Sequence, residues 1–188
     1  MAQDRASVKR LILTLTVIGV FGSLFLAFVF NWTNPYILEH EARAREEAIM
    51  TALPDAVRYE EEVRDDRTFY IGFDEAEQQV GVALTVTKGG YQGMIDVMVG
   101  VDPDRERIID ISILNHEETP GLGARITEER YKENFRDKPI EEYEIVNRPP
   151  EEPYEVENIA GATISAETVM NIVMEAGNIA LEHFGGGN

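Results

Sequence analysis

Cysteine is absent from this 188-residue sequence, and basic residues and histidine are scarce. Without cysteine the chain has no disulfide, no thiolate-held iron–sulfur cluster and no Cys-type zinc site. Any electron chemistry must then use an organic cofactor or the metals of a partner. The 17 Lys and Arg residues stand against 35 Asp and Glu residues, which gives a formal net charge of −18. This acidity argues against nucleic-acid binding, which needs a basic face, and against adsorption to anionic lipid.

The sequence also lacks the residue patterns of a self-contained enzyme. Its three histidines have no clustered partners, so no metal site is predicted, and His116 is interpreted as a surface or hydrogen-bonded residue. No nucleophile is paired with a base, and no nucleotide-binding fingerprint is present. We therefore expect no catalytic residue and no substrate-converting site in this chain.

Residues 11–30 carry no charge, and as a helix they would span about 30 Å, the thickness of the hydrocarbon layer of a membrane. A secretory signal peptide is the first alternative, but its apolar region is normally about 7–15 residues long and precedes a small-residue cleavage site. A buried helix of a soluble protein is the second. Here Trp32 and Tyr36 follow the run, and both suit the membrane interface. The run therefore predicts a retained transmembrane anchor.

Basic residues at Arg5, Lys9 and Arg10 precede the anchor and predict a cytoplasmic N-terminus, a single pass through the inner membrane and an exterior remainder. That remainder has a net charge of −20, because three basic residues and one acidic residue lie ahead of it. We interpret its acidity as solubility rather than as a specific docking face. The predicted divisions are a cytoplasmic segment (1–10), the anchor (11–30), a stalk helix (31–54) and an extracytoplasmic domain (55–188).

The exterior domain changes to strand periodicity. Turn residues at Lys88-Gly89-Gly90 and Asp102-Pro103-Asp104 separate runs of alternating apolar residues. These runs lie near residues 69–73, 80–86, 95–101 and 109–113. They predict an antiparallel meander of about four strands, each with one buried face, and the fold class α+β. A short helix is expected over 127–135, and mostly loop over 138–153.

A final helix is predicted from about Ala166 to His183, because apolar residues recur at spacings of three and four. Ser165 is expected to cap its start, and the glycines at 185–187 to stop it. Thr163 would then lie just ahead of a helix N-terminus, where free N–H groups and the helix dipole favour an anion such as phosphate.

Gly161 and Ala162 leave the backbone beside the Thr163 hydroxyl nearly bare, so that a bulky group can approach it. A place to hold a phosphorylated group is one interpretation of these residues. An ordinary junction between a loop and a helix cap is the other, and composition alone favours it.

A second glycine-containing stretch, residues 115–123, follows the fourth predicted strand and reads Asn-His-Glu-Glu-Thr-Pro-Gly-Leu-Gly. Pro120 and Gly121 have the form of a type II turn, in which proline presets φ and glycine accepts a positive value. Gly123 allows a second close approach, and Thr119 and the turn amides supply hydrogen-bond donors. A tight strand-to-helix connection would use the same residues.

Together the two stretches resemble a known family. Gly161-Ala162-Thr163-Ile164-Ser165 is similar to the flavinylation motif Asp-x-x-Ser/Thr-Gly-Ala-Thr of FMN-binding domains, although Glu157 replaces the aspartate and Ala160 the Ser/Thr. Residues 115–123 resemble the signature His-x-Glu-Thr-Pro-Gly-Leu-Gly of the G subunit of the Rnf ion-translocating ferredoxin:NAD oxidoreductase. The related C subunit of the sodium-pumping NADH:quinone oxidoreductase usually lacks the histidine. The resemblance therefore favours the G subunit.

The resemblance implies FMN as the cofactor, attached by a flavin transferase through a phosphoester to Thr163, with the Pro120 loop around the isoalloxazine ring. The cofactor-binding residues that it implies, besides Thr163, are Glu118, Thr119, Gly121, Leu122, Gly123, Gly161, Ala162 and Ser165. The chain would then be a one-electron carrier within a translocase. Its partners would be the other Rnf subunits, among them A and E with an iron–sulfur centre and D with another flavin.

Three other functions stay open at this point. One is the C subunit of the sodium-pumping enzyme. Another is a membrane-tethered FMN-binding redox sensor, although such proteins usually carry further transmembrane helices or cytoplasmic domains. The last is a stalk-like structural subunit without cofactor, which would be colourless when purified.

Overall fold

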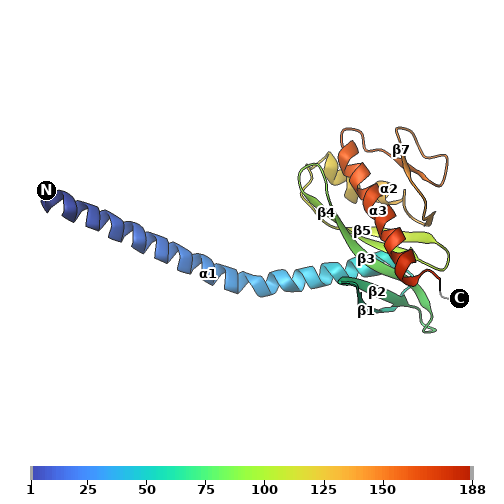
Figure 1. Ribbon diagram of the computed structural model, residues 1–188, viewed down its shortest axis with the longest axis horizontal. Coiled ribbons are helices and arrows are strands. Elements are labelled where there is room, and N and C mark those ends of the chain that lie inside the picture. Colours follow the sequence, from blue (N-terminus) through green and yellow to red (C-terminus); the bar gives the residue numbers. More distant parts are fainter. Residues whose placement is uncertain (1, 187–188) are drawn as a thin grey trace. The chain divides into compact units, whose positions relative to one another are not determined.

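The computed structural model describes the backbone of residues 2–186, with side chains from Lys9 onward (Figure 1). The chain divides into one unit that ends at Arg43 and a compact domain that begins at Ala44. In chain order the elements are α1 (Ala2–Ala52), β1 (Arg58–Arg64), β2 (Arg67–Phe73), β3 (Gln79–Gly89), β4 (Met94–Asp102), β5 (Arg107–His116), η1 (Gly123–Thr127), α2 (Glu129–Lys132), β6 (Lys138–Pro139), β7 (Glu144–Val146), β8 (Glu155–Glu157) and α3 (Thr163–Phe184). A long apolar helix, an antiparallel sheet and flanking helices confirm the predicted α+β class.

α1 is continuous through the predicted anchor and the predicted stalk, and it ends just before Pro54. It is long and apolar enough to cross a membrane once, with a mean hydropathy of 2.4 in its apolar portion. The hydroxyls of Thr14 and Thr16 in this portion donate to carbonyls one turn back, each over 2.9 Å. These polar groups are therefore satisfied within the helix, as a hydrocarbon environment requires.

Strands β1 to β6 form one antiparallel sheet in which each strand pairs with the next one in the sequence. The predicted meander corresponds to β2, β3, β4 and β5. β3 and β4 pair from Val82 opposite Val101 to Gly89 opposite Met94. A tight turn joins them, closed by a 2.7 Å hydrogen bond from the N–H of Gly90 to the carbonyl of Gly93.

The sequence does not predict β1, which pairs with β2 along the edge of the sheet. Most of its residues are charged, and its two arginines each pair with a glutamate of the same strand. Arg64, for example, donates to Glu62 over 2.8 Å. An edge strand with little buried surface shows no apolar alternation, and charged side chains are a common feature of such edges. This explains why the acidic stretch near Glu62 carries no strand signal.

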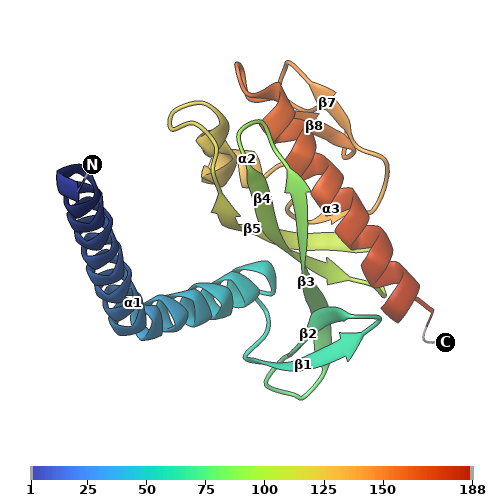
Figure 2. The same cartoon turned by 60° about the vertical axis from the view of Figure 1, so that its left-hand side comes forward.

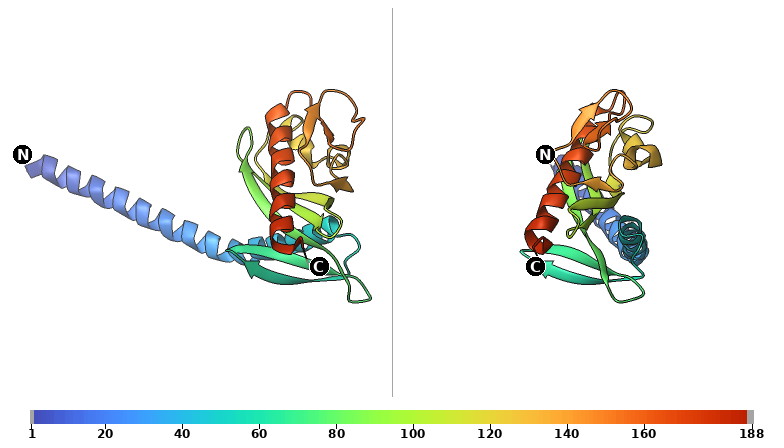
Figure 3. Two further views of the ribbon diagram at one scale, coloured as in Figure 1. Left: turned by 45° about the vertical axis from the view of Figure 1, so that its right-hand side comes forward. Right: turned by 90° about the vertical axis from the view of Figure 1, so that its right-hand side faces the viewer.

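The sheet is covered on both faces, and α3 lies along one of them (Figures 2 and 3). The predicted apolar stripe of α3 is confirmed, since Val169, Ile172, Val173, Ala176 and Ala180 are all buried. On the other face the end of α1 contributes Ala48, Ile49, Ala52 and Leu53, which pack with Tyr70, Ala83 and Met98. The expectation of one buried face per strand is therefore wrong for β4, whose last six residues are buried on both sides.

Two predicted boundaries are also wrong. α3 begins at Thr163 with Ala162 as its N-cap, so Ser165 is not the cap. The expected helix over 127–135 is a 3₁₀-helix, η1, followed by the single turn α2, because the backbone bonds there are a mixture of three- and four-residue turns. The expectation of mostly loop over 138–153 is confirmed, since only the short strands β6 and β7 interrupt it, and β7 pairs in parallel with β8.

The close packing of α1 on the sheet depends on Gly100 in β4, because a Cβ there would overlap the carbonyl group of Ala52. Gly100→Ala should lower the free energy of unfolding of the full chain in detergent by about 1–3 kcal/mol, since the end of α1 must move. Urea unfolding followed by circular dichroism measures this. Gly89→Ala is the matched control, because a Cβ at that position meets nothing within 4 Å. Equal losses in both variants would contradict the explanation.

Candidate functional site

The two glycine-containing stretches of the sequence meet at one pocket. Its volume of about 340 Å³ lies within the range of about 300–1,000 Å³ that is typical of small-molecule sites. The pocket is lined by Tyr91, Glu118, Thr119, Leu122, Gly123, Gly161, Ala162, Thr163, Ile164 and Ser165. Of the predicted site residues, only Gly121 is not part of this lining. The tertiary structure thus brings together residues that lie about forty positions apart in the chain.

Gly121 instead shapes the turn beside the pocket. The N–H of Leu122 donates to the carbonyl of Thr119 over 3.1 Å, and Gly121 has φ +77°. Both features agree with the predicted turn centred on Pro120 and Gly121, which needs positive φ at its third residue. The turn leaves Leu122 exposed at the rim of the pocket.

Glu118 is buried below this turn, with only 4% of its surface exposed. Its carboxylate accepts hydrogen bonds from the Ser165 hydroxyl over 2.7 Å and from the N–H of Gln92 over 3.1 Å. Burial alone raises the pKa of Glu118, but the hydrogen bonds from Ser165 and from the N–H groups of the Tyr91–Gly93 turn outweigh it and lower the pKa. Glu118 is therefore a buried anion stabilised by hydrogen bonds.

Gly123 makes room for this carboxylate. A Cβ at Gly123 would lie 2.5 Å from Oε2 of Glu118 and 2.7 Å from the hydroxyl of Ser165. The sequence predicts that some group approaches the backbone at Gly123 closely, and in the structure that group is the Glu118 side chain. The same contact explains why Ser165 does not cap α3, because its hydroxyl is already bonded to Glu118.

Thr163 is the first residue of α3 and is exposed. The first helical hydrogen bond runs from the N–H of Ala166 to the carbonyl of Ala162 over 3.1 Å. The N–H groups of the three residues before Ala166 precede that bond, and Ala162 has no side chain that can cap them. Donors and helix dipole therefore converge beside the Thr163 hydroxyl, a chemistry that fits a phosphate group.

Gly161 leads into this helix with φ +82°, and a Cβ there would approach Leu122 at 3.5 Å. Its left-handed backbone brings the chain into the pocket with no side chain between Leu122 and the start of α3. The predicted bare approach to Thr163 is thus present.

The sequence did not identify two residues near Thr163 as part of the site. Tyr91, in the turn between β3 and β4, lines the pocket with 70% of its surface exposed. Asn158 donates from Nδ2 to the Thr163 hydroxyl oxygen over 3.0 Å. An aromatic residue between two glycines is a signal that could have found Tyr91. Asn158 gives no signal, because its contact depends on how the chain folds back between β8 and α3.

His116 is hydrogen-bonded, as one of its two interpretations requires. Its Nδ1 accepts the N–H of Glu118 over 3.2 Å, at the end of β5. The imidazole therefore helps to set the direction in which the chain leaves the sheet and enters the turn.

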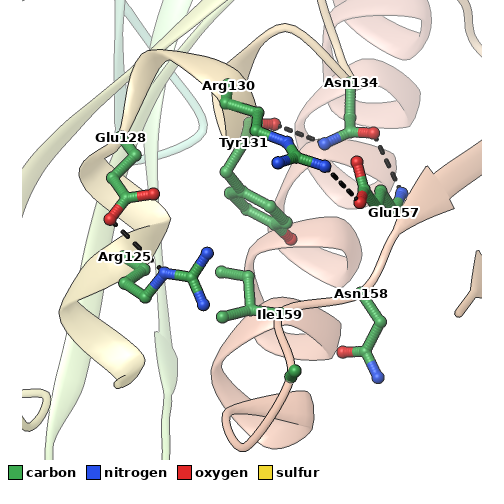
Figure 4. Close-up of a pocket in the computed structure, with 9 residues that line it drawn as sticks. Arg125, Glu128, Arg130, Tyr131, Asn134, Glu157, Asn158 and Ile159 are labelled. Atoms are coloured by element: carbon green, nitrogen blue, oxygen red, sulfur yellow. Dashed lines mark hydrogen bonds and ion pairs between the residues drawn. The ribbon is translucent and has the colours of Figure 1, made fainter. Parts of the chain in front are cut away.

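A second, smaller pocket of about 150 Å³ lies between the residues of η1 and α2 and the segment that leads to α3 (Figure 4). Glu157 and Ala160, the two departures from the flavinylation motif, line this pocket rather than the first one. The carboxylate of Glu157 forms an ion pair with Arg130 over 2.6 Å, and the backbone N–H of Glu157 donates to Oδ1 of Asn134 over 2.9 Å (Figure 4). The acidic position of the motif therefore anchors the segment to α2 and does not face Thr163.

Known proteins are similar to this chain to different extents. The FMN-binding domain family matches residues 90–178, which include both stretches. Two solved structures of C subunits are similar in fold. One is NqrC of Shewanella oneidensis, with a TM-score of 0.52, 19% identity and coverage of 65% of this chain and 66% of that one. The other is the C subunit of the Na⁺-translocating NADH-quinone reductase of Parabacteroides distasonis, with a TM-score of 0.51, 21% identity and coverage of 61% of each chain. At these identities the likeness shows the fold alone.

Two curated relatives match over almost the whole chain. The G subunit of the ion-translocating oxidoreductase complex of Methanosarcina acetivorans is 30% identical over 181 residues, which cover 92% of this chain and 94% of that protein. The G subunit of the proton-translocating ferredoxin:NAD⁺ oxidoreductase complex of Clostridium ljungdahlii is 25% identical, with coverage of 93% and 92%. The chain therefore belongs to the family of G subunits of ion-translocating oxidoreductase complexes.

Proposed function

We propose that this chain carries one FMN, joined to Thr163 through a phosphoester, and relays single electrons between other subunits of a membrane-bound ion-translocating complex. Its family and its FMN-binding domain make it an electron-carrying flavoprotein of an oxidoreductase. The observation that carries the finer proposal is the position of Thr163. Its exposed hydroxyl lies at the uncapped start of α3, inside a pocket that both sequence motifs line.

The phosphate end of the cofactor would lie at the first turn of α3. The three N–H groups ahead of the first helical bond have no partner within the helix, and a phosphate joined to Thr163 would accept hydrogen bonds from them. The helix dipole adds a favourable interaction with a negative group, of about 0.3–1 kcal/mol at exposed sites. The helix start thus favours a phosphodiester as well as supplying its attachment point.

The isoalloxazine ring would lie across the mouth of the pocket. Three apolar side chains there are unusually exposed: Tyr91 (70%), Leu122 (47%) and Ile164 (50%). They surround a backbone left open by Gly161, and an aromatic side chain such as Tyr91 offers a flat face to a planar ring. Bound FMN would bury this apolar surface, which supports the pocket as the ring site.

A phosphoester leaves the ring chemically unchanged, so the ring's surroundings would set its reduction potential. FMN supplies one-electron chemistry when it is bound, and the chain's own residues hold it and exclude water. We infer no substrate site in this chain. The electron partners would be other subunits, namely A and E with their iron–sulfur centre and D with its flavin, and a flavin transferase would attach the cofactor.

The chain is a membrane-anchored subunit, with one helix long enough to cross the bilayer. We further propose that its N-terminus is cytoplasmic and that the flavin domain lies outside. Lys9 and Arg10 precede the apolar run, and the first residues after it are uncharged. A covalent bond then has a purpose, because FMN lost outside the cytoplasm could not be replenished.

The first prediction from this proposed function concerns attachment. Thr163→Ala should abolish covalent flavin in the full chain expressed together with a flavin transferase, because the acceptor oxygen is gone. Thr163→Ser should keep some flavin, since it retains the hydroxyl. Intact mass and ultraviolet-excited fluorescence in a denaturing gel measure both. Thr127→Ala, at an exposed threonine in η1, is the control and should be labelled fully. A flavin adduct on the Thr163→Ala chain would place the bond elsewhere.

The second prediction concerns the potential. Hydrogen bonds lower the pKa of Glu118, so its carboxylate is ionised at pH 7 and opposes the arrival of an electron on the ring. Glu118→Gln should therefore raise the one-electron potential of the bound flavin by on the order of 50 mV, about 1 kcal/mol. A redox titration at pH 7 followed by visible absorbance measures it. Glu117→Gln changes an exposed neighbour and should shift the potential little. Equal potentials for Glu118→Gln and wild type would move the ring away from this pocket.

The third prediction concerns topology. Protease added to intact spheroplasts should digest the domain from about Ala44 onward and leave a small membrane-bound stub, because the domain faces outward. Immunoblotting for tags at each end distinguishes the fragments. If the domain is protected in spheroplasts and digested only after lysis, the flavin lies on the cytoplasmic side.

A further inference from the structure

Asn158 is fixed from two directions in the short segment between β8 and α3. Its N–H donates to the carbonyl of Val146, at the end of β7, over 2.8 Å. Its side-chain Nδ2 donates to Oδ1 of Asn147 over 2.8 Å and to Oγ1 of Thr163 over 3.0 Å. A side-chain amide has two N–H donors, so both are used.

The oxygen of the same amide has no partner. Among the side chains that the structure describes, Oδ1 of Asn158 is the one buried polar atom that lacks a hydrogen bond. Buried acceptors are nearly always paired, so an exception calls for a reason. The reason here is that the amide nitrogen is directed at its two acceptors, Asn147 and Thr163, which leaves the amide oxygen on the side without a donor. In Figure 4 the side chain of Asn158 accordingly points away from Arg130 and Glu157.

We propose that Asn158 is a positioning residue for the phosphoryl transfer that attaches FMN to Thr163, an inference that rests on the function proposed above. The polar side-chain contact to the Thr163 hydroxyl comes from Asn158. By donating to one lone pair of Oγ1, the amide directs the hydroxyl proton and the other lone pair away from the protein. The reacting lone pair then faces an incoming flavin donor.

The attachment step balances with a flavin dinucleotide as the donor. Oγ1 of Thr163 forms a bond to the phosphorus that bears the flavin, and the phosphoanhydride bond to the nucleotide breaks. A nucleoside monophosphate leaves with the electron pair of that bond, and the hydroxyl proton passes to a base of the transferase or to water. A donor to Oγ1 stabilises the negative charge that develops there as the proton leaves.

A positioning role acts on the chemical step rather than on recognition of the chain. Misplacement of a reacting group by about 1 Å can cost on the order of a hundredfold in rate. Without the amide the Thr163 hydroxyl is free to rotate among its staggered positions. The docking surface for the transferase stays the same, so the KM for the chain should not change.

The experiment uses the full chain in detergent, produced without a transferase and then treated with purified flavin transferase and FAD. Labelling is followed by intact mass, both under single-turnover conditions and as a function of chain concentration. Asn158→Ala should lower the limiting rate by about 10- to 100-fold with KM within about twofold of wild type. Asn158→Asp should be slowed similarly, because a carboxylate cannot donate to Oγ1. Asn178→Ala, at an exposed asparagine of α3, is the control and should react at the wild-type rate.

The end point separates positioning from misfolding. A slow but folded variant reaches one flavin per chain, whereas a misfolded fraction lowers the end point and leaves the rate of the remainder unchanged. A wild-type limiting rate for Asn158→Ala or Asn158→Asp, or a loss confined to KM or to the end point, would overturn the inference. Thr163→Ala is run in parallel. If that variant is labelled, the proposed function itself fails; if it is not labelled while Asn158→Ala reacts normally, only the role of Asn158 fails.

Discussion

The site depends on one buried charge, the carboxylate of Glu118. Without a cation against it in the described part of the chain, this anion is stabilised by hydrogen bonds from the β3–β4 turn and from Ser165. A buried carboxylate is tolerated only when such donors replace its lost hydration. Glycine at Gly90 and Gly123 supplies the space, because a Cβ at either position would overlap its oxygens. The charge thereby joins the turn, the loop after β5 and α3 into one structure.

This arrangement also explains why the start of α3 is open. The hydroxyl of Ser165 is committed to Glu118, and Ala162 offers no side-chain oxygen to the first turn. Donors that a capping residue would normally occupy stay free beside Thr163. The helix thus forgoes a stabilising cap at the position where a phosphate would take the cap's place. The start of α3 is less stable without a cap, and its free N–H groups are the groups that would bind a phosphate.

Sequence patterns predicted the parts of the fold in which apolar residues recur periodically, namely β2 to β5 and α3. They missed β1, an edge strand whose charges carry no alternation, and placed the start of α3 three residues late because Ser165 looks like a cap. Glu118 and Thr163 were found through resemblance to family motifs. Tyr91 was not, because it reaches the pocket only after the β3–β4 turn has packed near the start of α3. Asn158 lies only five residues before Thr163, but their contact depends on the irregular segment between β8 and α3, which has no periodic pattern.

The last two turns of α1 are part of the folded domain as well as of the long helix. Ala48, Ile49 and Ala52 are buried against the sheet and belong to the same compact unit as the pocket beside Thr163. The chain therefore has no flexible linker immediately before β1. A soluble fragment that began after Pro54 would leave Tyr70 and Met98 uncovered and prone to self-association. Release of this domain from its membrane, whether by a protease or by gene rearrangement, must spare the end of the helix that anchors it.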